Sequence, residues 1–239
     1  MDEDVLKGKT LMVVDDETDL RDIVASELEF MGAKVFQAEN IASAQKILSQ
    51  NKIDLIVSDI RMPGGTGIDL LDIVKAKDVD VPPVILITGF ADITLEDAFD
   101  KGAEALLNKP FKLDDLIKLV VRYTSPFAER FNEPGSAQKT IHAVVDKDSI
   151  HFGRGGLALS VDTEGKKFDI GESVNFDLDY DNHHYTGIGV CRWFRPLDHG
   201  TNRALMGLEF TNLTQDSLLH FQKTFEGRTV VPYIPSLKA

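Results

Sequence analysis

The chain has 239 residues, 26 Lys and Arg against 39 Asp and Glu, and a formal net charge of −13; this length suggests two domains. The acidic balance argues against nucleic-acid backbones and anionic membrane surfaces as main partners, because both attract basic side chains. The single cysteine excludes an internal disulfide, and no apolar run approaches the ~20 residues of a membrane-spanning helix. The acidic start does not resemble a secretory signal, so we expect a cytoplasmic protein.

The charge and the pattern of apolar residues change along the chain. Residues 1–130 hold 15 Lys and Arg against 25 Asp and Glu, and residues 131–239 hold 11 against 14. Short apolar runs alternate with helical patterns in the first part, whereas alternating segments and glycine turns dominate the second. The stretch between them is rich in Pro, Gly and Ser, which is typical of a linker. We therefore predict domains over residues 1–124 and 139–239, joined by a linker over 125–138.

The first part is predicted to be a doubly wound α/β domain. Buried strands are expected at Thr10–Asp15, Val35–Ala38, Leu55–Ser58, Val84–Thr88 and Ala105–Leu107. Amphipathic helices are expected at Thr18–Met31, Ile41–Leu48, Gly67–Ala76, Ile93–Lys101 and Leu113–Tyr123. Strands that alternate with helices pair in parallel, with helices on both faces of the sheet. The sequence therefore predicts a five-stranded parallel sheet with a ligand site at the carboxyl ends of its strands.

Polar side chains stand at four of these strand ends. Asp15 and Asp16 follow the first strand, Asp59 the third, Thr88 the fourth and Lys109 the fifth. Clustered carboxylates repel one another, and a hard divalent ion such as Mg²⁺, which prefers oxygen ligands, relieves that repulsion. A carboxylate beside such an ion can attack a phosphoryl group. The Lys ammonium and the Thr hydroxyl are suited to hold phosphoryl oxygens.

This arrangement resembles the receiver domain of two-component response regulators over residues 8–124. The segments that carry the resemblance are VVDDE at 13–17, LIVSDIRMPGGTGIDLL at 55–71, ILITGFAD at 85–92 and GAEALLNKPFKLDDL at 102–116. The resemblance implies a flavodoxin-like fold and a phosphoryl group accepted on Asp59. Added charge on that residue would bias a two-state loop and helix region.

The resemblance also implies roles for the neighbouring residues. Mg²⁺ would be held by Asp59, by Asp16 directly, by Asp15 through water and by the backbone carbonyl of Arg61. Thr88 would move toward the phosphoryl group, and Lys109 would pair with it after a cis peptide bond to the following proline. The family usually has Tyr or Phe three residues before this Lys, where the chain has Leu106. Either aliphatic packing substitutes for the ring, which we favour, or the coupling to the output face is altered.

The second part is predicted to be a small antiparallel β-barrel with a closing helix. Strands are expected at Thr140–Val145, Gly156–Val161, Ser173–Tyr180, His184–Phe194 and Arg203–Phe210, and a helix at Asp216–Phe225. The segments GRGGLALSV at 153–161, FDIGESVNFDLDY at 168–180, IGVCRWFRP at 188–196 and LMGLEFTNLTQDSLLHFQ at 205–222 resemble a PilZ domain.

PilZ domains usually bind cyclic di-GMP through R-x-x-x-R and [D/N]-x-S-x-x-G motifs, and this chain departs from both. The second motif falls on residues 151–156, where His151 and Gly153 replace the acidic or amide residue and the serine. Arg122 and Arg130 are eight residues apart, and no lysine replaces the planar arginine contacts. We therefore expect a degenerate domain that contacts proteins and for which cyclic di-GMP is an unlikely ligand.

Other candidates in the second part have ordinary structural explanations. A metal site from His151, His183, His184 and Cys191 lacks ligand spacing, so exposed histidines and a buried thiol are favoured. An anion site is disfavoured for the four arginines Arg154, Arg192, Arg195 and Arg203. Trp193 is expected in the core. The tail VVPYIPSLKA could dock on a partner, although a loosely packed terminus is favoured.

The sequence therefore predicts a response regulator and not an enzyme. Its expected partners are a sensor histidine kinase, a downstream protein and, through the receiver, a second copy in a homodimer. DNA is not expected as a partner, because the second part has neither a helix-turn-helix pattern nor a net positive charge. The alternative is an effector that senses cyclic di-GMP through non-standard residues.

Overall fold

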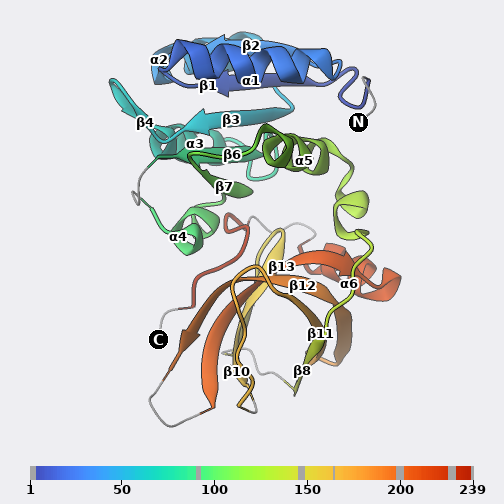
Figure 1. Ribbon diagram of the computed structural model, residues 1–239. Coiled ribbons are helices and arrows are strands. Elements are labelled where there is room, and N and C mark those ends of the chain that lie inside the picture. Colours follow the sequence, from blue (N-terminus) through green and yellow to red (C-terminus); the bar gives the residue numbers. More distant parts are fainter. Residues whose placement is uncertain are drawn as a thin grey trace. The chain divides into compact units, whose positions relative to one another are not determined.

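The computed structural model describes residues 4–89, 93–144, 149–163, 165–197, 202–225 and 230–237 (Figure 1). By its contacts the chain divides into two units, and each is described by itself. Unit 1 comprises Met1–Thr94 and Lys101–Ser125, and unit 2 comprises Leu95–Asp100 and Pro126–Ala239. In the part of the chain described, no helix is long and apolar enough to cross a membrane.

Unit 1 contains the five-stranded parallel sheet that the sequence predicts. Its strands are β1 (Thr10–Val14), β2 (Lys34–Ala38), β3 (Leu55–Asp59), β6 (Val84–Thr88) and β7 (Ala105–Asn108). Its helices are α1 (Thr18–Phe30), α2 (Ile41–Gln50), α3 (Gly67–Lys75) and α5 (Leu113–Thr124). The strand order β2-β1-β3-β6-β7 confirms the doubly wound topology. Every residue of β3 and β6 is buried, as expected for central strands covered on both faces.

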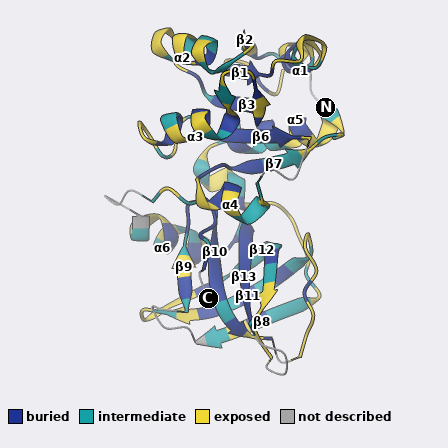
Figure 2. Ribbon diagram, turned by 90° about the vertical axis from the view of Figure 1, so that its left-hand side faces the viewer, coloured by how far each residue is buried: buried dark blue, intermediate teal, exposed yellow. Residues whose placement is uncertain are grey.

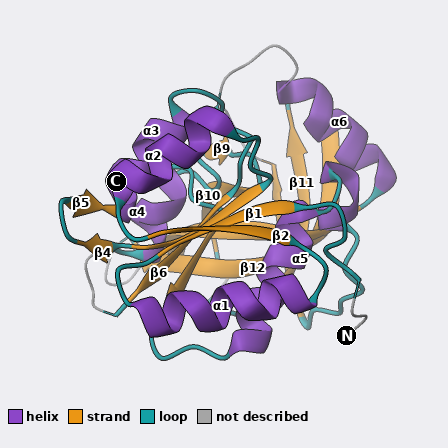
Figure 3. Ribbon diagram, turned by 90° about the horizontal axis from the view of Figure 1, so that it is seen from above, coloured by secondary structure: helices purple, strands orange, loops and turns teal. Residues whose placement is uncertain are grey.

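The helices lie on both sides of this sheet. Viewed from above, α1 and α5 lie on one side of the strands, and α2 and α3 on the other (Figure 3). Asn40 and Thr66 begin α2 and α3 with reciprocal side-chain caps, which satisfy backbone donors that the first turn leaves open. A short hairpin of β4 (Arg61–Met62) and β5 (Gly65–Thr66) follows β3 and was not predicted. Ile23 of α1 is 57% exposed.

One buried ion pair joins α3 to Glu104, the residue directly before β7. Lys75 Nζ lies 2.9 Å from Glu104 Oε1, and both side chains are buried. Glu104 Oε2 also accepts a hydrogen bond from the backbone N–H of Val84 at 2.6 Å, and Lys75 donates to the carbonyl of Val79 at 3.1 Å. Each charge therefore depends on the other, because removal of one partner leaves the second buried without compensation.

Unit 2 is built on a six-stranded sheet. Its strands are β8 (Lys139–Val144), β9 (Ile150–Phe152), β10 (Gly156–Asp162), β11 (Ser173–Tyr180), β12 (His183–Pro196) and β13 (Arg203–Leu213). Two helices, α4 (Leu95–Asp100) and α6 (Gln215–Phe225), also belong to this unit. Residue 145, which was expected in the first strand, lies outside the described residues.

The sheet order is β8-β11-β12-β13-β10-β9. All its pairings are antiparallel except that of β8 with β11, which is parallel. The prediction of a purely antiparallel arrangement is therefore wrong for this edge, because β8 begins beside the start of β11, where Lys139 pairs with Val174. The expected closing helix is present as α6, and no pairing between β8 and β9 closes the sheet among the residues described.

The core of unit 2 lies on one face of this sheet and is rich in aromatic side chains. Phe131, Phe210 and Phe221 contact one another, with ring centroids 5.2 to 6.3 Å apart. Phe131 comes from the segment expected to be an exposed linker, where a short 3-10 helix, η1 (Phe127–Phe131), places its ring in the core. Burial is deepest along β10 and β13 (Figure 2).

A bulge in β12 gives the opposite face of the sheet a second apolar cluster. Cys191 pairs with Leu208 and Trp193 pairs with Gly207, so Arg192 is an extra residue in the strand. In a regular strand, residues two apart share a face, but the extra residue turns Trp193 away from the main core that holds Cys191. The expectation that Trp193 lies in the core is therefore correct only for this smaller cluster.

We predict that Glu104→Leu lowers the free energy of unfolding by about 3–5 kcal/mol, because it leaves the Lys75 ammonium buried and uncompensated. The double variant Lys75→Met/Glu104→Leu should regain part of that loss. Urea unfolding followed by circular dichroism measures both. As a control, Lys101→Met removes an exposed ion pair with Asp72 and should cost less than about 1 kcal/mol. Equal effects of Glu104→Leu and Lys101→Met would contradict this account.

Candidate functional site

The polar residues singled out in the first domain stand at the carboxyl ends of its strands. Asp15 directly follows β1, Asp59 ends β3, Thr88 ends β6, and Lys109 directly follows β7. The strands that carry them are neighbours in the parallel sheet, so their carboxyl ends share one edge. Asp15, Asp59 and Thr88 are buried and Lys109 is partly buried.

The ammonium group of Lys109 is the centre of this group. Its Nζ lies 2.8 Å from Asp59 Oδ1, 3.2 Å from Asp15 Oδ2 and 2.9 Å from Glu17 Oε1. The Lys109–Pro110 peptide bond is cis, as expected. The Lys109 backbone N–H donates to the carbonyl of Thr88 at 2.6 Å, which ties the end of β7 to the end of β6. The structure therefore brings Asp15, Asp59 and Lys109 together.

A backbone hydrogen bond orients the Asp59 carboxylate. Its Oδ2 accepts a hydrogen bond from the N–H of Arg61 at 2.7 Å, so one oxygen faces the hairpin and the other faces Lys109. Gly67 begins α3 so close to Asp59 that an added Cβ would overlap the Asp59 carbonyl oxygen. A residue without a side chain is needed for this close approach, which gives the last glycine of the GGTG sequence a structural reason.

Burial and the ion pairs act in opposite directions on these groups. Burial raises the pKa of Asp15, and the hydrogen bond from the Glu17 N–H and the nearby Lys109 only partly offset that rise. Burial lowers the pKa of Lys109, but hydrogen bonds to Asp59 and Glu17 outweigh it, so the pKa lies above its ordinary value. Lys109 is therefore a permanent cation at neutral pH, and Asp15 would be favoured as a carboxylate by any further cation.

The remaining predicted ligands lie at the rim. Asp16 and Arg61 are exposed, and Arg61 meets Asp59 through its backbone N–H. Sequence reasoning missed Glu17, the third partner of Lys109, although it belongs to the same acidic run. It also missed Arg21, whose guanidinium donates to the Asp15 carbonyl at 2.6 Å. Nothing in the helical pattern of α1 distinguishes Arg21 from a solvent-exposed arginine.

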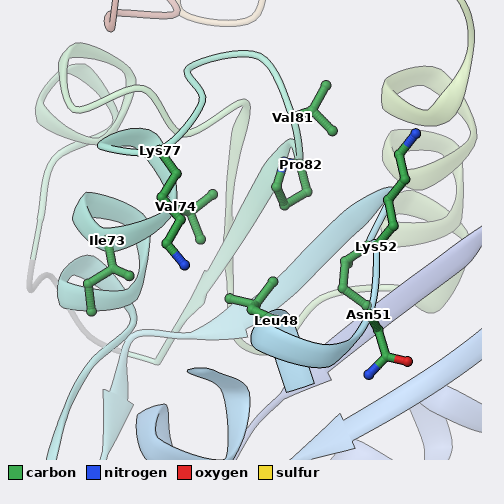
Figure 4. A pocket seen from close by; sticks show the side chains of 9 residues that line it. Leu48, Asn51, Lys52, Ile73, Val74, Lys77, Val81 and Pro82 are labelled. Atoms are coloured by element: carbon green, nitrogen blue, oxygen red, sulfur yellow. The ribbon is translucent and has the colours of Figure 1, made fainter. Parts of the chain in front are cut away.

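A pocket of unit 1 lies away from these residues. It is lined by residues from the ends of α2 and α3 and from the segments that precede β3 and β6: Leu48, Asn51, Lys52, Ile53, Ile73, Val74, Lys77, Val81 and Pro82 (Figure 4). Because these segments lead into the amino ends of the strands, the pocket is at the opposite end of β3 and β6 from Asp59 and Thr88. It therefore has no part in the candidate site.

The histidine and cysteine candidates of unit 2 are not brought together. Cys191 is buried in the main core, and burial raises the pKa of its thiol to about 11. His184 contacts Asp179 at 2.8 Å, and the ring of His183 faces His220 instead. In the described part of the chain, no group of three His, Cys, Asp or Glu side chains is arranged to hold a metal ion.

The four arginines also have separate partners. Arg192 pairs with Glu209 at 2.6 Å, and Arg195 pairs with Glu96 at 2.9 Å. Arg203 donates to the Ser160 hydroxyl at 3.1 Å. The Arg154 Nε donates to the carbonyl of Val231 at 3.1 Å. The structure therefore does not assemble an anion site from them.

Comparison with known proteins assigns the first domain. Residues 11–121 match the response regulator receiver domain. The phosphate regulon transcriptional regulatory protein PhoB of Pseudomonas aeruginosa is 34% identical over 124 residues, which cover 50% of this chain and 54% of PhoB. The chain thus spans about half the length of this relative, and 24–28% of several other curated regulators.

Solved structures of response regulators, including the following two, are similar over 48% of the chain. The receiver domain of NtrX from Brucella abortus is 35% identical, with 97% of its chain covered and a TM-score of 0.45. The response regulator TrrA from Thermotoga maritima, solved in complex with Mg²⁺-BeF, is 29% identical, with 98% covered and a TM-score of 0.43. A receiver is a signalling domain, so the family match confirms that this domain is not an enzyme. Residues 11–121 are therefore a response regulator receiver domain, which is followed in this chain by a β-rich C-terminal domain.

Proposed function

We propose that Asp59 accepts a phosphoryl group from a sensor histidine kinase and that the C-terminal domain relays the signal. The observation that carries this proposal is the Lys109 ammonium, which holds the buried carboxylates of Asp59 and Asp15 at one sheet edge. In the transfer, an Asp59 carboxylate oxygen forms a bond to phosphorus while the bond from phosphorus to the donor breaks. Lys109 then faces the new phosphoryl oxygens as a charge-assisted donor.

The donor set fits Mg²⁺ as the cofactor. Asp15 and Asp59 are two carboxylates within 3.2 Å of one ammonium nitrogen, and Asp16 and Arg61 are exposed residues next to them in the sequence. Mg²⁺ usually takes one or two carboxylates and keeps several waters, so a full cage of protein ligands is not required. When bound, the ion would neutralise charge on the carboxylates and the phosphoryl oxygens. The Mg²⁺-BeF complex of the related TrrA supports this assignment.

For the output we propose that a PilZ-like C-terminal domain changes its contacts with other proteins. We also propose that the receiver forms a homodimer. Thr88 and Leu106 lie on the neighbouring strands β6 and β7, where Leu86 pairs with Leu106. We propose that Thr88 responds to the phosphoryl group and that aliphatic packing at Leu106 replaces the aromatic residue usual in the family. The chain offers DNA no basic surplus, so we propose a protein as its downstream partner.

We predict that Asp59→Ala abolishes phosphorylation of the chain, because the substitution removes the attacking oxygen. Incubation with Mg²⁺ and a small phosphoryl donor, followed by mass spectrometry, should add one phosphoryl group to the wild type and none to the variant. Asp22→Ala, at an exposed position of α1, should behave like the wild type. A wild-type chain that takes up no phosphoryl group would refute the proposal.

We also predict that Lys109→Met tightens Mg²⁺ binding by about ten-fold at low salt, because one cation no longer competes at Asp15 and Asp59. Calorimetric titration with MgCl₂ measures the effect. Lys112→Met, which changes an exposed lysine nearby in the sequence, is the matched control and should leave the affinity unchanged. Weaker Mg²⁺ binding by Lys109→Met would show that Lys109 does not balance the carboxylates.

Cyclic di-GMP sensing is the alternative, and the contacts of Arg154 argue against it. This arginine lies in the region of the second PilZ motif, but its side chain is buried and its Nε donates to Val231. A guanidinium held in this way is not presented for stacking on a guanine face. We predict no micromolar binding of cyclic di-GMP to the full chain by calorimetry. A micromolar Kd would favour the nucleotide effector.

A further inference from the structure

The C-terminal segment Val230–Leu237 is packed into unit 2, which corrects the expectation of a loose terminus. Tyr233, Ile234 and Leu237 are 2%, 0% and 5% exposed. None of the residues of this segment carries a charged side chain, so its contacts are apolar or use the backbone, apart from the Ser236 hydroxyl, which donates to Glu96. Three walls hold it: the glycine turn at residues 153–156, the Trp193 cluster, and α4.

The glycine turn forms the first wall. The backbone N–H groups of Arg154 and Gly155 donate to the carbonyls of Pro232 and Tyr233 at 3.0 and 2.9 Å. A Cβ added to Gly155 would overlap the Tyr233 ring, and one added to Gly153 would lie 2.5 Å from the Tyr233 carbonyl oxygen. The glycines of this turn therefore make room for an extended segment with an aromatic side chain.

The Trp193 cluster forms the second wall. The β12 bulge turns Trp193 to the face where Ala158 and Leu205 lie, and Leu237 packs on this group. An Arg195 guanidinium nitrogen donates to the Leu237 carbonyl oxygen. The guanidinium of Arg195 also lies 5.4 Å from the Trp193 ring. The wall therefore combines an apolar surface with one backbone-directed donor.

Helix α4 forms the third wall. The Tyr233 N–H donates to the Phe99 carbonyl at 2.8 Å, and their rings lie 5.7 Å apart. Ser236 donates its N–H to Asp100 Oδ1 at 2.8 Å and its hydroxyl to Glu96 Oε1 at 2.6 Å. Along the chain, α4 begins seven residues after Thr88, the proposed switch residue.

We propose that these three walls form a peptide-binding groove, and that the C-terminal segment occupies it as an intramolecular competitor of the downstream partner. The partner would present an extended, uncharged segment with an aromatic side chain between aliphatic or proline residues, like Pro232–Pro235. Backbone hydrogen bonds from the turn would give affinity, and the space over Gly155 would give specificity. This inference deepens the proposed function, since it rests on an output by protein contact.

The test titrates a labelled peptide of sequence VVPYIPSLKA into the full chain and follows its anisotropy. The wild-type chain should bind it at least ten-fold more weakly than a Tyr233→Ala chain, whose groove has lost its own aromatic side chain. The same peptide with Ala in place of Tyr should lose at least ten-fold affinity for the Tyr233→Ala chain. Equal binding by the two chains, or by the two peptides, would overturn the proposal.

Further variants locate the groove. In the Tyr233→Ala chain, Gly155→Ala should reduce peptide affinity at least ten-fold, whereas Gly135→Ala, where a Cβ meets only ordinary contacts, should leave it unchanged. Fluorescence of Trp193, the single tryptophan, reports whether each variant is folded, and the two peptides remain as the test if Gly155→Ala is not. Because the assay needs no phosphorylation, an Asp59→Ala background should give the same result, so failure of the groove and failure of Asp59 phosphorylation are separable.

Discussion

The receiver site depends on the ion pairs that the ammonium group of Lys109 makes with Asp15 and Asp59. Asp15 and Asp59 are buried carboxylates whose repulsion would oppose folding, and Lys109 lies within 3.2 Å of both. The parallel sheet is the reason that these charges meet, because it gathers the ends of β1, β3, β6 and β7 at one edge. The ion pairs thus offset the carboxylate repulsion that the sheet topology creates. A phosphoryl group or a divalent ion at this edge would change its charge balance.

A different constraint organises the C-terminal domain. The main core covers one face of its sheet. If β12 alternated regularly, Trp193 would lie on that face with Cys191, and the opposite face would lack its ring. The extra residue in β12 places Trp193 on that opposite face, and Leu237 covers it. In the glycine turn, the ring of Tyr233 occupies the space that a side chain at Gly155 would take. A bulge and a glycine turn together therefore make residues 230–237 part of the folded domain.

Much of the receiver could be predicted from the sequence, because its central strands are short apolar runs and a polar residue of the site stands at four of the five strand ends. The candidate residues Asp15, Asp59 and Lys109 were found in this way. Glu17 and Arg21 were not, since an exposed glutamate and a helical arginine carry no pattern until the fold brings them to Lys109 and Asp15. In the second domain, the parallel β8 and the buried Phe131 were missed because the path of the linker depends on contacts distant in sequence.

The sequence by itself determined the α/β and β-rich halves, the strand ends that carry chemistry and the receiver family, because periodicity and motif spacing are local properties of the chain. Only the tertiary structure decided which charges Lys109 neutralises, which face Trp193 occupies and where the C-terminal segment lies. These features depend on a bulge, on close backbone approaches and on hydrogen bonds between residues as far as 92 and 136 positions apart. The segment VVPYIPSL at residues 230–237 has no periodicity of its own, so its place is set by the shape of the surface that it covers.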